Sequence, residues 1–162
     1  MRIIIPMAGM GKRMRPHTLS IPKPLLPIAG KPMVQWIAED IAKVCSENIE
    51  EIAFVIGTFG KEVENTLVGI ANRLGAKGRI YYQPQALGTA HAVLCAGNSL
   101  KGKVVVAFAD TLFSADFKMD EELDGIIWVQ KIKDPSQFGV VKVNEQNIIT
   151  GFFEKPKTFV SD

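Results

Sequence analysis

The sequence predicts an α/β fold in which a Rossmann-like, mainly parallel sheet carries helices on both faces. Short runs of consecutive apolar residues, such as Ile3 to Ile5, alternate with longer segments in which apolar residues recur at helical spacing. Strands joined by helices of this length form right-handed crossovers, which place successive strands parallel to one another.

The elements are expected in a regular order. The apolar runs predict strands at residues 2–6, 52–56, 79–82, 104–109, 126–132 and 140–143, the last ones at hairpin rather than crossover spacing. Helices are expected from Pro32 to about Asn48, at residues 63–74 and at residues 90–96. Residues 8–32 hold three glycines and five prolines, which predicts an ordered, extended loop between the first strand and the first helix.

Length and composition restrict the class of protein. With 162 residues, 47% of them apolar and 22% charged, the chain can form one domain with its own core, and disordered, collagen-like and coiled-coil chains are excluded. Cys45 and Cys95 form no disulfide or zinc pattern, so we expect reduced thiols and a cytoplasmic location. No apolar run approaches the roughly 18 residues of a membrane span.

Basic residues gather at one end of the sequence. Residues 1–38 contain six Lys or Arg and no Asp or Glu, although the net charge of the chain is only +2. A nucleic-acid-binding protein more often shows a long basic stripe and a high overall pI, so we expect no nucleic-acid partner. A small polyanion fits the local charge better, with chance clustering as the alternative.

The segment 8–16, AGMGKRMRP, directly follows the first expected strand, where parallel sheets bind their ligands. Its glycines let backbone N–H groups approach phosphate oxygens, and Lys12 and Arg13 add charged donors. It is not a P-loop, because Arg13 stands where Ser or Thr would be needed, and Met14 replaces the third glycine of a dinucleotide fingerprint. A tight turn with solvated cations is the alternative.

The segment 21–32, IPKPLLPIAGKP, holds Lys23 in a stiff, proline-rich loop. Later segments are LGTA after Gln83, FADT at 108–111, FGVV at 138–141 and EKP at 154–156. With these motifs in this order, the chain resembles the sugar-1-phosphate nucleotidyltransferases, or nucleotide-sugar pyrophosphorylases, over its whole length. Within the family, it resembles glucose-1-phosphate thymidylyltransferases and uridylyltransferases.

The resemblance implies a nucleotide-diphospho-sugar transferase fold and a reaction. In this family an oxygen of the sugar 1-phosphate attacks the α-phosphorus of a nucleoside triphosphate, and pyrophosphate leaves. Because the attacking group is already anionic, catalysis rests on alignment and charge stabilisation, with Mg²⁺ as cofactor. The leading expectation is glucose 1-phosphate with dTTP. The alternatives are the same reaction with UTP, or with GTP and mannose 1-phosphate.

The resemblance also implies roles for single residues. The catalytic residues would be Arg13, Lys23 and Asp110, with Asp110 also binding the metal. Nucleotide binding would involve Ala8, Gly9, Gly11, Lys12, Arg13, Gln83, Gly88 and Thr89. Gln83 and the backbone of Gly88 would read the base, and the sugar phosphate would meet Gly139, Glu154 and Lys155.

Ordinary structural roles remain open for several of these residues. Gln83 could cap a strand end, Gly88 could begin a helix, and Glu154 and Lys155 could form an exposed ion pair. His91, in an apolar helix, is expected to pack or to make a hydrogen bond rather than to act as a general base.

The sequence departs from the family pattern in two ways. Lys12 stands where the family usually has Thr or Ser, and the short AGxG form of the loop is more similar to some uridylyltransferases. Family members are longer, and a second magnesium-binding Asp would follow Asp162. We therefore expect an N-terminal catalytic domain, truncated at its C-terminal end, that binds nucleotide but turns over poorly and that could assemble as a homo-oligomer. A non-catalytic sensor of nucleotides is the alternative.

Overall fold

The computed structural model describes residues 1–9, 11–120 and 122–156. The chain forms two compact units, Met1–Glu121 and Glu122–Asp162, which are described separately. No helix in the described part of the chain is long and apolar enough to cross a membrane.

The first unit is built on four parallel strands, and this confirms the predicted α/β class. They are β1 (Arg2–Pro6), β4 (Glu51–Ile56), β5 (Lys77–Tyr82) and β6 (Val104–Val106), in the order β5-β4-β1-β6. The chain winds to one side of β1 first and to the other side later. Ligands of such sheets bind at the carboxyl ends of the strands, where this direction reverses.

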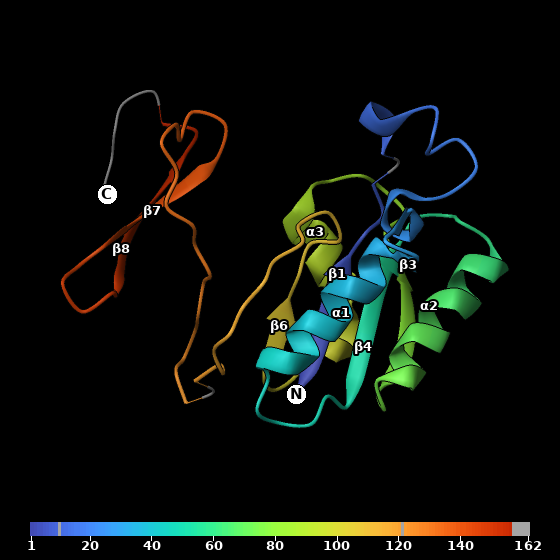
Figure 1. Ribbon diagram of the computed structural model, residues 1–162, viewed down its shortest axis with the longest axis horizontal. Coiled ribbons are helices and arrows are strands. Elements are labelled where there is room, and N and C mark those ends of the chain that lie inside the picture. The colour runs from blue at the N-terminus through green and yellow to red at the C-terminus, as the bar shows by residue number, and fades with distance from the viewer. Residues whose placement is uncertain (10, 121, 157–162) are drawn as a thin grey trace. The chain divides into compact units, whose positions relative to one another are not determined.

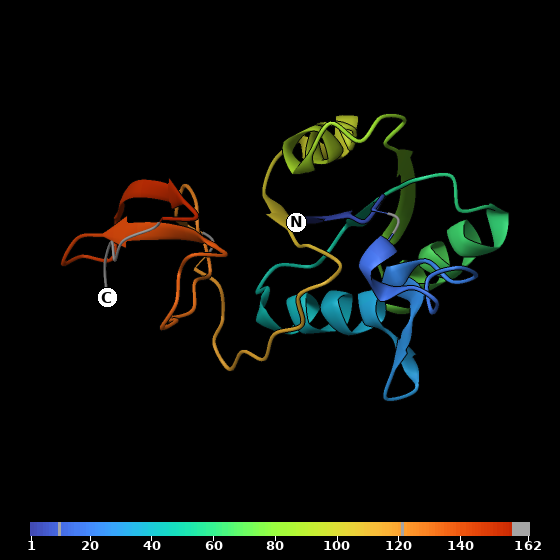
Figure 2. The ribbon, with the colours of Figure 1, turned by 90° about the horizontal axis from the view of Figure 1, so that it is seen from above.

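Helices cover both faces of the sheet, as predicted. The helices α1 (Met33–Val44) and α2 (Lys61–Arg73) lie on one face, and the short α3 (Thr89–Leu94) lies on the other (Figures 1 and 2). Ile3 and Ile5 are buried in the core beneath α1 and α2, whereas Ile4 packs with Ala92 and Ala96 on the α3 side. Because both faces are covered, the central strands are apolar at successive positions rather than alternate ones.

The proline-rich segment between β1 and α1 is extended, with only short regular pieces. These are the 3-10 turns η1 (Lys12–Met14) and η2 (Lys23–Leu25) and the two-residue strands β2 (Pro27–Ile28) and β3 (Lys31–Pro32). A 3-10 turn η3 (Gly97–Leu100) follows α3. Pro32 was expected as the first helical residue, but it directly precedes α1, which begins at Met33 and ends at Val44 rather than near Asn48.

Two strand predictions need correction. The strand expected at 104–109 is only Val104–Val106, because it pairs with β1 over three residues alone. Residues 126–132 form no strand, although their apolar pattern predicted one. A strand needs a neighbour that satisfies its backbone groups, and no described strand pairs with this segment.

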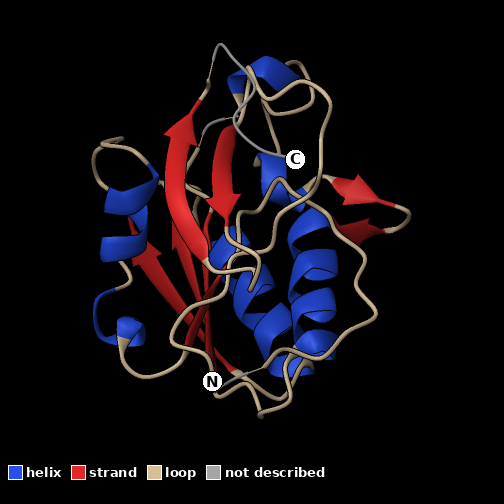
Figure 3. Ribbon diagram, turned by 90° about the vertical axis from the view of Figure 1, so that its left-hand side faces the viewer, coloured by secondary structure: helices blue, strands red, loops and turns tan. Residues whose placement is uncertain are grey.

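The second unit contains an antiparallel hairpin of β7 (Gly139–Val143) and β8 (Ile149–Glu154), drawn as two antiparallel red arrows in Figure 3. The strand predicted at 140–143 is thereby confirmed, and β8 is its unpredicted partner. The side chain of Asn144 shapes the turn, because its Oδ1 accepts hydrogen bonds from the N–H groups of Gln146 and Ile148.

Candidate functional site

A cleft of about 340 Å³ lies beyond the carboxyl ends of β1, β5 and β6. Its lining includes many of the residues that the sequence pointed to, namely Ala8, Gly9, Lys23, Gln83, Gly88, Thr89 and Asp110. Pro24 and Phe108 also line the cleft and were not predicted as site residues. Segments far apart in the sequence therefore meet where a parallel sheet is expected to bind its ligand.

An ion pair connects two of these segments. Nζ of Lys23, in η2, donates a hydrogen bond to Oδ2 of Asp110, 2.9 Å away. This bond from Lys23 holds the pKa of the Asp110 carboxyl below its ordinary value, and a longer hydrogen bond from the Thr111 hydroxyl acts in the same direction. The cleft thus contains an ionised carboxylate beside a cation.

The loop that contains Gly11 packs closely against Cβ of Lys23. Gly11 has a φ of +59°, and a Cβ at this position would lie 3.0 Å from both Cβ of Lys23 and Cγ2 of Thr18. The Thr18 hydroxyl donates a 2.8 Å hydrogen bond to the carbonyl of Gly11. Only glycine fits both the left-handed backbone and the close approach, so Gly11 brings the loop against Lys23.

The structure does not place every predicted nucleotide-binding residue in the cleft lining. Gly11, Lys12 and Arg13 are not among the residues that line it. Gly11 directly precedes η1, and Lys12 and Arg13 lie within it. The side chains of Lys12 and Arg13 are exposed, and no hydrogen bond or ion pair to another described residue engages them. They therefore present positive charge to solvent.

Gln83 and Gly88 are linked to each other at the end of β5. Nε2 of Gln83 donates a 3.0 Å hydrogen bond to the carbonyl of Gly88 and lies 3.1 Å from Nδ1 of His91. Gly88, with a φ of +98°, is the residue at which the chain turns into α3. The hydrogen bond expected of His91 is present, but its partner was not foreseen, since Gln83 lies eight residues away and outside the helix.

The predicted sugar-phosphate residues gather at one end of the hairpin in the second unit. Gly139 lies opposite Glu154 in the strand register, and a Cβ on Gly139 would be 3.3 Å from Oε2 of Glu154. Nζ of Lys155 is 3.5 Å from Oε1 of Glu154, and both side chains are exposed. These three residues therefore form one polar cluster within their own unit.

The residues of the cleft fit a magnesium ion that is held by one protein carboxylate and by the phosphates of a ligand. No group of three or more His, Cys, Asp or Glu side chains that could hold a metal occurs among the described residues. Asp110 brings a single carboxylate to the cleft wall. Mg²⁺ commonly keeps several waters and binds through one or two carboxylates together with substrate phosphates, so the donor set fits an ion shared with a phosphate ligand.

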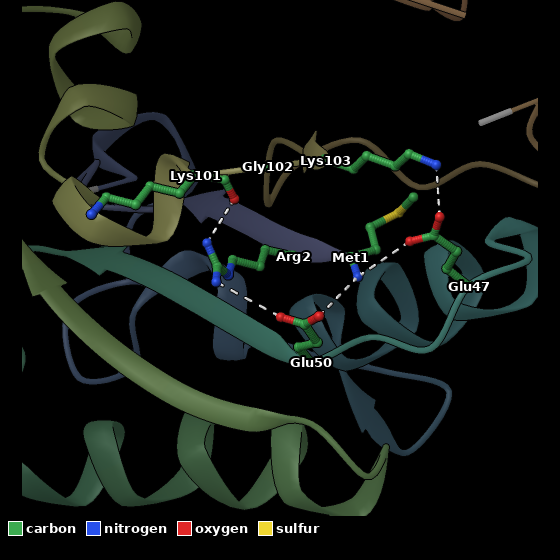
Figure 4. A pocket seen from close by; sticks show the side chains of 7 residues that line it. All are labelled: Met1, Arg2, Glu47, Glu50, Lys101, Gly102 and Lys103. Atoms are coloured by element: carbon green, nitrogen blue, oxygen red, sulfur yellow. Dashed lines mark hydrogen bonds and ion pairs between the residues drawn. The ribbon is translucent and has the colours of Figure 1, made fainter. Parts of the chain in front are cut away.

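A second hollow, of about 390 Å³, lies at the amino ends of β1, β4 and β6 and has a different character (Figure 4). The amino group of Met1 lies 3.7 Å from Glu47 and 4.0 Å from Glu50, and Arg2 pairs with Glu50 at 3.7 Å. Lys103 pairs with Glu47 at 2.7 Å. These ion pairs neutralise one another's charges and connect the amino ends of neighbouring strands.

The sheet order and the polar cleft at its carboxyl edge define an α/β protein of the doubly wound class, with a cleft where such sheets bind their ligands. The model of the family described as nucleotidyl transferase matches residues 2–162. The chain belongs to this family, that of the sugar-1-phosphate nucleotidyltransferases.

Individual relatives agree with this assignment. The chain is 37% identical over 161 residues to the bifunctional protein GlmU of Methanococcus maripaludis strain C5, covering 97% of this chain and 36% of that protein. A solved structure from Bacillus anthracis, named as a glucose-1-phosphate thymidylyltransferase, has a TM-score of 0.76 and 26% identity, covering 97% and 65% of the two chains. UDP-glucose pyrophosphorylase complexed with UDP-glucose has a TM-score of 0.70 and 25% identity, covering 96% and 68%. The chain spans 36% of the length of the GlmU relatives that it matches.

Proposed function

We propose that this chain carries the nucleotide-binding part of an enzyme that transfers a nucleotidyl group to a sugar 1-phosphate. An oxygen of the sugar phosphate would form a bond to the α-phosphorus, while the bond from that phosphorus to pyrophosphate breaks and pyrophosphate leaves. The observation that carries the proposal is the Lys23–Asp110 pair in a cleft that also contains Gln83 and Gly88. A cation, a carboxylate and an amide are the groups needed for phosphate, metal and base.

Each charged group has a role in this proposal. Lys23 would neutralise charge on the reacting phosphates, and Asp110 would hold Mg²⁺. When bound, the metal supplies positive charge to the phosphate oxygens. Arg13 and Lys12, exposed on η1, stabilise the negative charge of the leaving pyrophosphate. Ala8 and Gly9 line the cleft just after β1, where their small size allows a phosphate to approach the backbone.

We further propose glucose 1-phosphate as the sugar substrate and dTTP or UTP as the nucleotide. Support comes from the two solved structures above, whose names mention glucose-1-phosphate thymidylyl transfer and UDP-glucose. GTP with mannose 1-phosphate is the alternative, since a relative from Drosophila melanogaster at 29% identity is named mannose-1-phosphate guanylyltransferase. We assign Gly139, Glu154 and Lys155 to binding of the sugar phosphate.

A cytoplasmic location agrees with the free thiols of Cys45 and Cys95. Assembly into a homo-oligomer is part of the same proposal.

A thermal-shift series tests the nucleotide. The melting temperature is measured with Mg²⁺ and each of dTTP, UTP, GTP, ATP and CTP. A ligand at 100 times its Kd adds about 2.7 kcal/mol to the stability, which raises the melting temperature by several degrees at this size. We expect dTTP or UTP to give the largest shift.

Matched variants separate the cleft from general charge effects. Lys23→Met should lose the shift, whereas Lys61→Met, which removes a lysine from the ion pair with Glu64 on α2, should keep it. If no triphosphate stabilises the unsubstituted chain, or if Lys23→Met responds as fully as Lys61→Met, the proposed nucleotide site is wrong.

A further inference from the structure

The side-chain amide of Gln83 is held in one orientation by its neighbours. Its Nε2 faces two groups, the carbonyl oxygen of Gly88 at 3.0 Å and Nδ1 of His91 at 3.1 Å. A carbonyl oxygen can only accept, so the NH₂ end of the amide must lie on this side. Turning the amide over would place two oxygen atoms against each other. The amide nitrogen of Gln83 therefore contacts both neighbours.

The orientation of Gln83 also favours one tautomer of His91. The amide nitrogen of Gln83 can only donate, so its 3.1 Å contact with Nδ1 of His91 is a hydrogen bond when Nδ1 is the unprotonated nitrogen of a neutral ring. This contact favours that tautomer, because an N–H on Nδ1 would face the N–H groups of the amide. The ring proton then lies on Nε2, which faces Sγ of Cys95 at 3.8 Å, one helical turn further along. Contacts with Gly88 and His91, and through His91 with Cys95, thus hold the side chain of Gln83 in place.

What remains for a ligand is the carbonyl oxygen of the amide. No described residue donates a hydrogen bond to Oε1 of Gln83, and Gln83 lines the cleft, whereas His91 does not. The backbone N–H of Gly88, which also lines the cleft, has no acceptor among the described residues. The wall of the cleft therefore presents one fixed acceptor and one fixed donor.

We propose that His91 is a positioning residue for base recognition, which holds the Gln83 amide so that Oε1 accepts the ring N–H of a uracil or thymine base. The inference rests on the proposed function and names the specificity device of that same cleft. Uracil and thymine carry an N–H at ring position 3, whereas cytosine has a bare acceptor nitrogen there. A fixed acceptor therefore favours UTP and dTTP and repels CTP.

Binding constants for three ligands test this inference. The ligands are UTP, its 3-methyluridine analogue, in which a methyl group replaces the hydrogen at N3, and inorganic tripolyphosphate, which has no base. For the unsubstituted chain we expect UTP to bind at least ~10-fold more tightly than the methylated analogue, as for a lost buried hydrogen bond. dTTP takes the place of UTP if it is the tighter nucleotide.

Two variants of His91 make the test specific. His91→Phe keeps a ring without an acceptor, and we expect the preference for UTP to fall to within ~3-fold while tripolyphosphate binding stays within ~2-fold. His91→Asn restores an acceptor at the position of Nδ1 and should recover the preference. A merely structural role would weaken all three ligands together and would not be rescued by Asn.

The outcomes separate the two proposals. If the unsubstituted chain binds neither nucleotide nor tripolyphosphate, the proposed function fails and the inference fails with it. If it binds UTP with the expected preference and His91→Phe retains that preference, only the role of His91 is overturned. Nitrogen NMR of the unsubstituted chain gives an independent check, because a proton on Nδ1 rather than Nε2 of His91 would also overturn it.

Discussion

Nζ of Lys23 lies 2.9 Å from Oδ2 of Asp110, and the pair joins the proline-rich loop before α1 to the loop after β6. In the proposed function, Lys23 binds phosphate and Asp110 binds the metal. Each now satisfies the other. When a magnesium-bound triphosphate binds, its phosphates would pair with Lys23 and its metal would pair with Asp110. Neither charge would then be left without a partner.

The first prediction concerns the charge of Asp110. Because the hydrogen bond from Lys23 is the main cause that holds the pKa of Asp110 below its ordinary value, Lys23→Met should raise this pKa. Carboxyl-carbon NMR during a pH titration measures the change. Lys61→Met, which removes a lysine remote from the cleft, is the control and should leave Asp110 as it is. An Asp110 titration that is the same in all three proteins would contradict this prediction.

The second prediction concerns Gly11. Alanine here would adopt a φ of +59° and place a methyl group 3.0 Å from the side chains of Lys23 and Thr18. We expect Gly11→Ala to lower the free energy of unfolding by about 1–2 kcal/mol, measured by urea denaturation. Gly9→Ala is the matched control, because no atom lies within 4 Å of its added Cβ, and it should change stability by less than about 0.5 kcal/mol. Equal effects of the two substitutions would show that the loop does not pack in this way.

The third prediction concerns Glu51, a buried carboxylate at the start of β4. Burial alone would raise the pKa of Glu51, but hydrogen bonds from Ser99 and Arg79 outweigh it and hold the pKa below its ordinary value. A depressed pKa in the folded state contributes stability that is present above the unfolded pKa and is lost as the pH falls through the folded one. Glu51→Gln should therefore be destabilised at neutral pH and should lose less stability than the unsubstituted chain on acidification.

Urea denaturation at a series of pH values from neutral into the acid range checks this difference. The exposed Glu145→Gln in the second unit serves as control and should follow the unsubstituted chain. An unchanged acid dependence in Glu51→Gln would rule out a contribution from this carboxylate.

Local sequence patterns account for most of the first unit. The apolar runs of β1 and β4 and the helical spacing in α1 and α2 are properties of adjacent residues, so they could be predicted without knowledge of the partners. The end of β6 and the absence of a strand at 126–132 could not, because a strand exists only where another chain segment pairs with it. β8 was missed for the same reason, since its partner strand determines it.

The candidate site follows a similar division. The positions of Gln83 and Asp110 at one edge of the sheet could be anticipated, since each directly follows a predicted strand. Lys23 could be expected nearby, because it lies in the loop that follows the first strand. Their mutual contacts could not, and neither could the contacts of the Gln83 amide nitrogen with the carbonyl of Gly88 and with Nδ1 of His91. Side-chain direction depends on the relative placement of whole elements, which spacing along the chain does not encode.

The complete burial of β4 has a consequence for how slowly its amides exchange with solvent. All six of its residues, Glu51–Ile56, are buried, and the strand pairs with β1 on one edge and β5 on the other. Its amide hydrogens should exchange with deuterium only when the whole unit unfolds, whereas those of the loops that carry Gly11 and Lys23 should exchange through local opening. The loop that carries Lys23 can then rearrange around a ligand while the sheet beneath it stays folded.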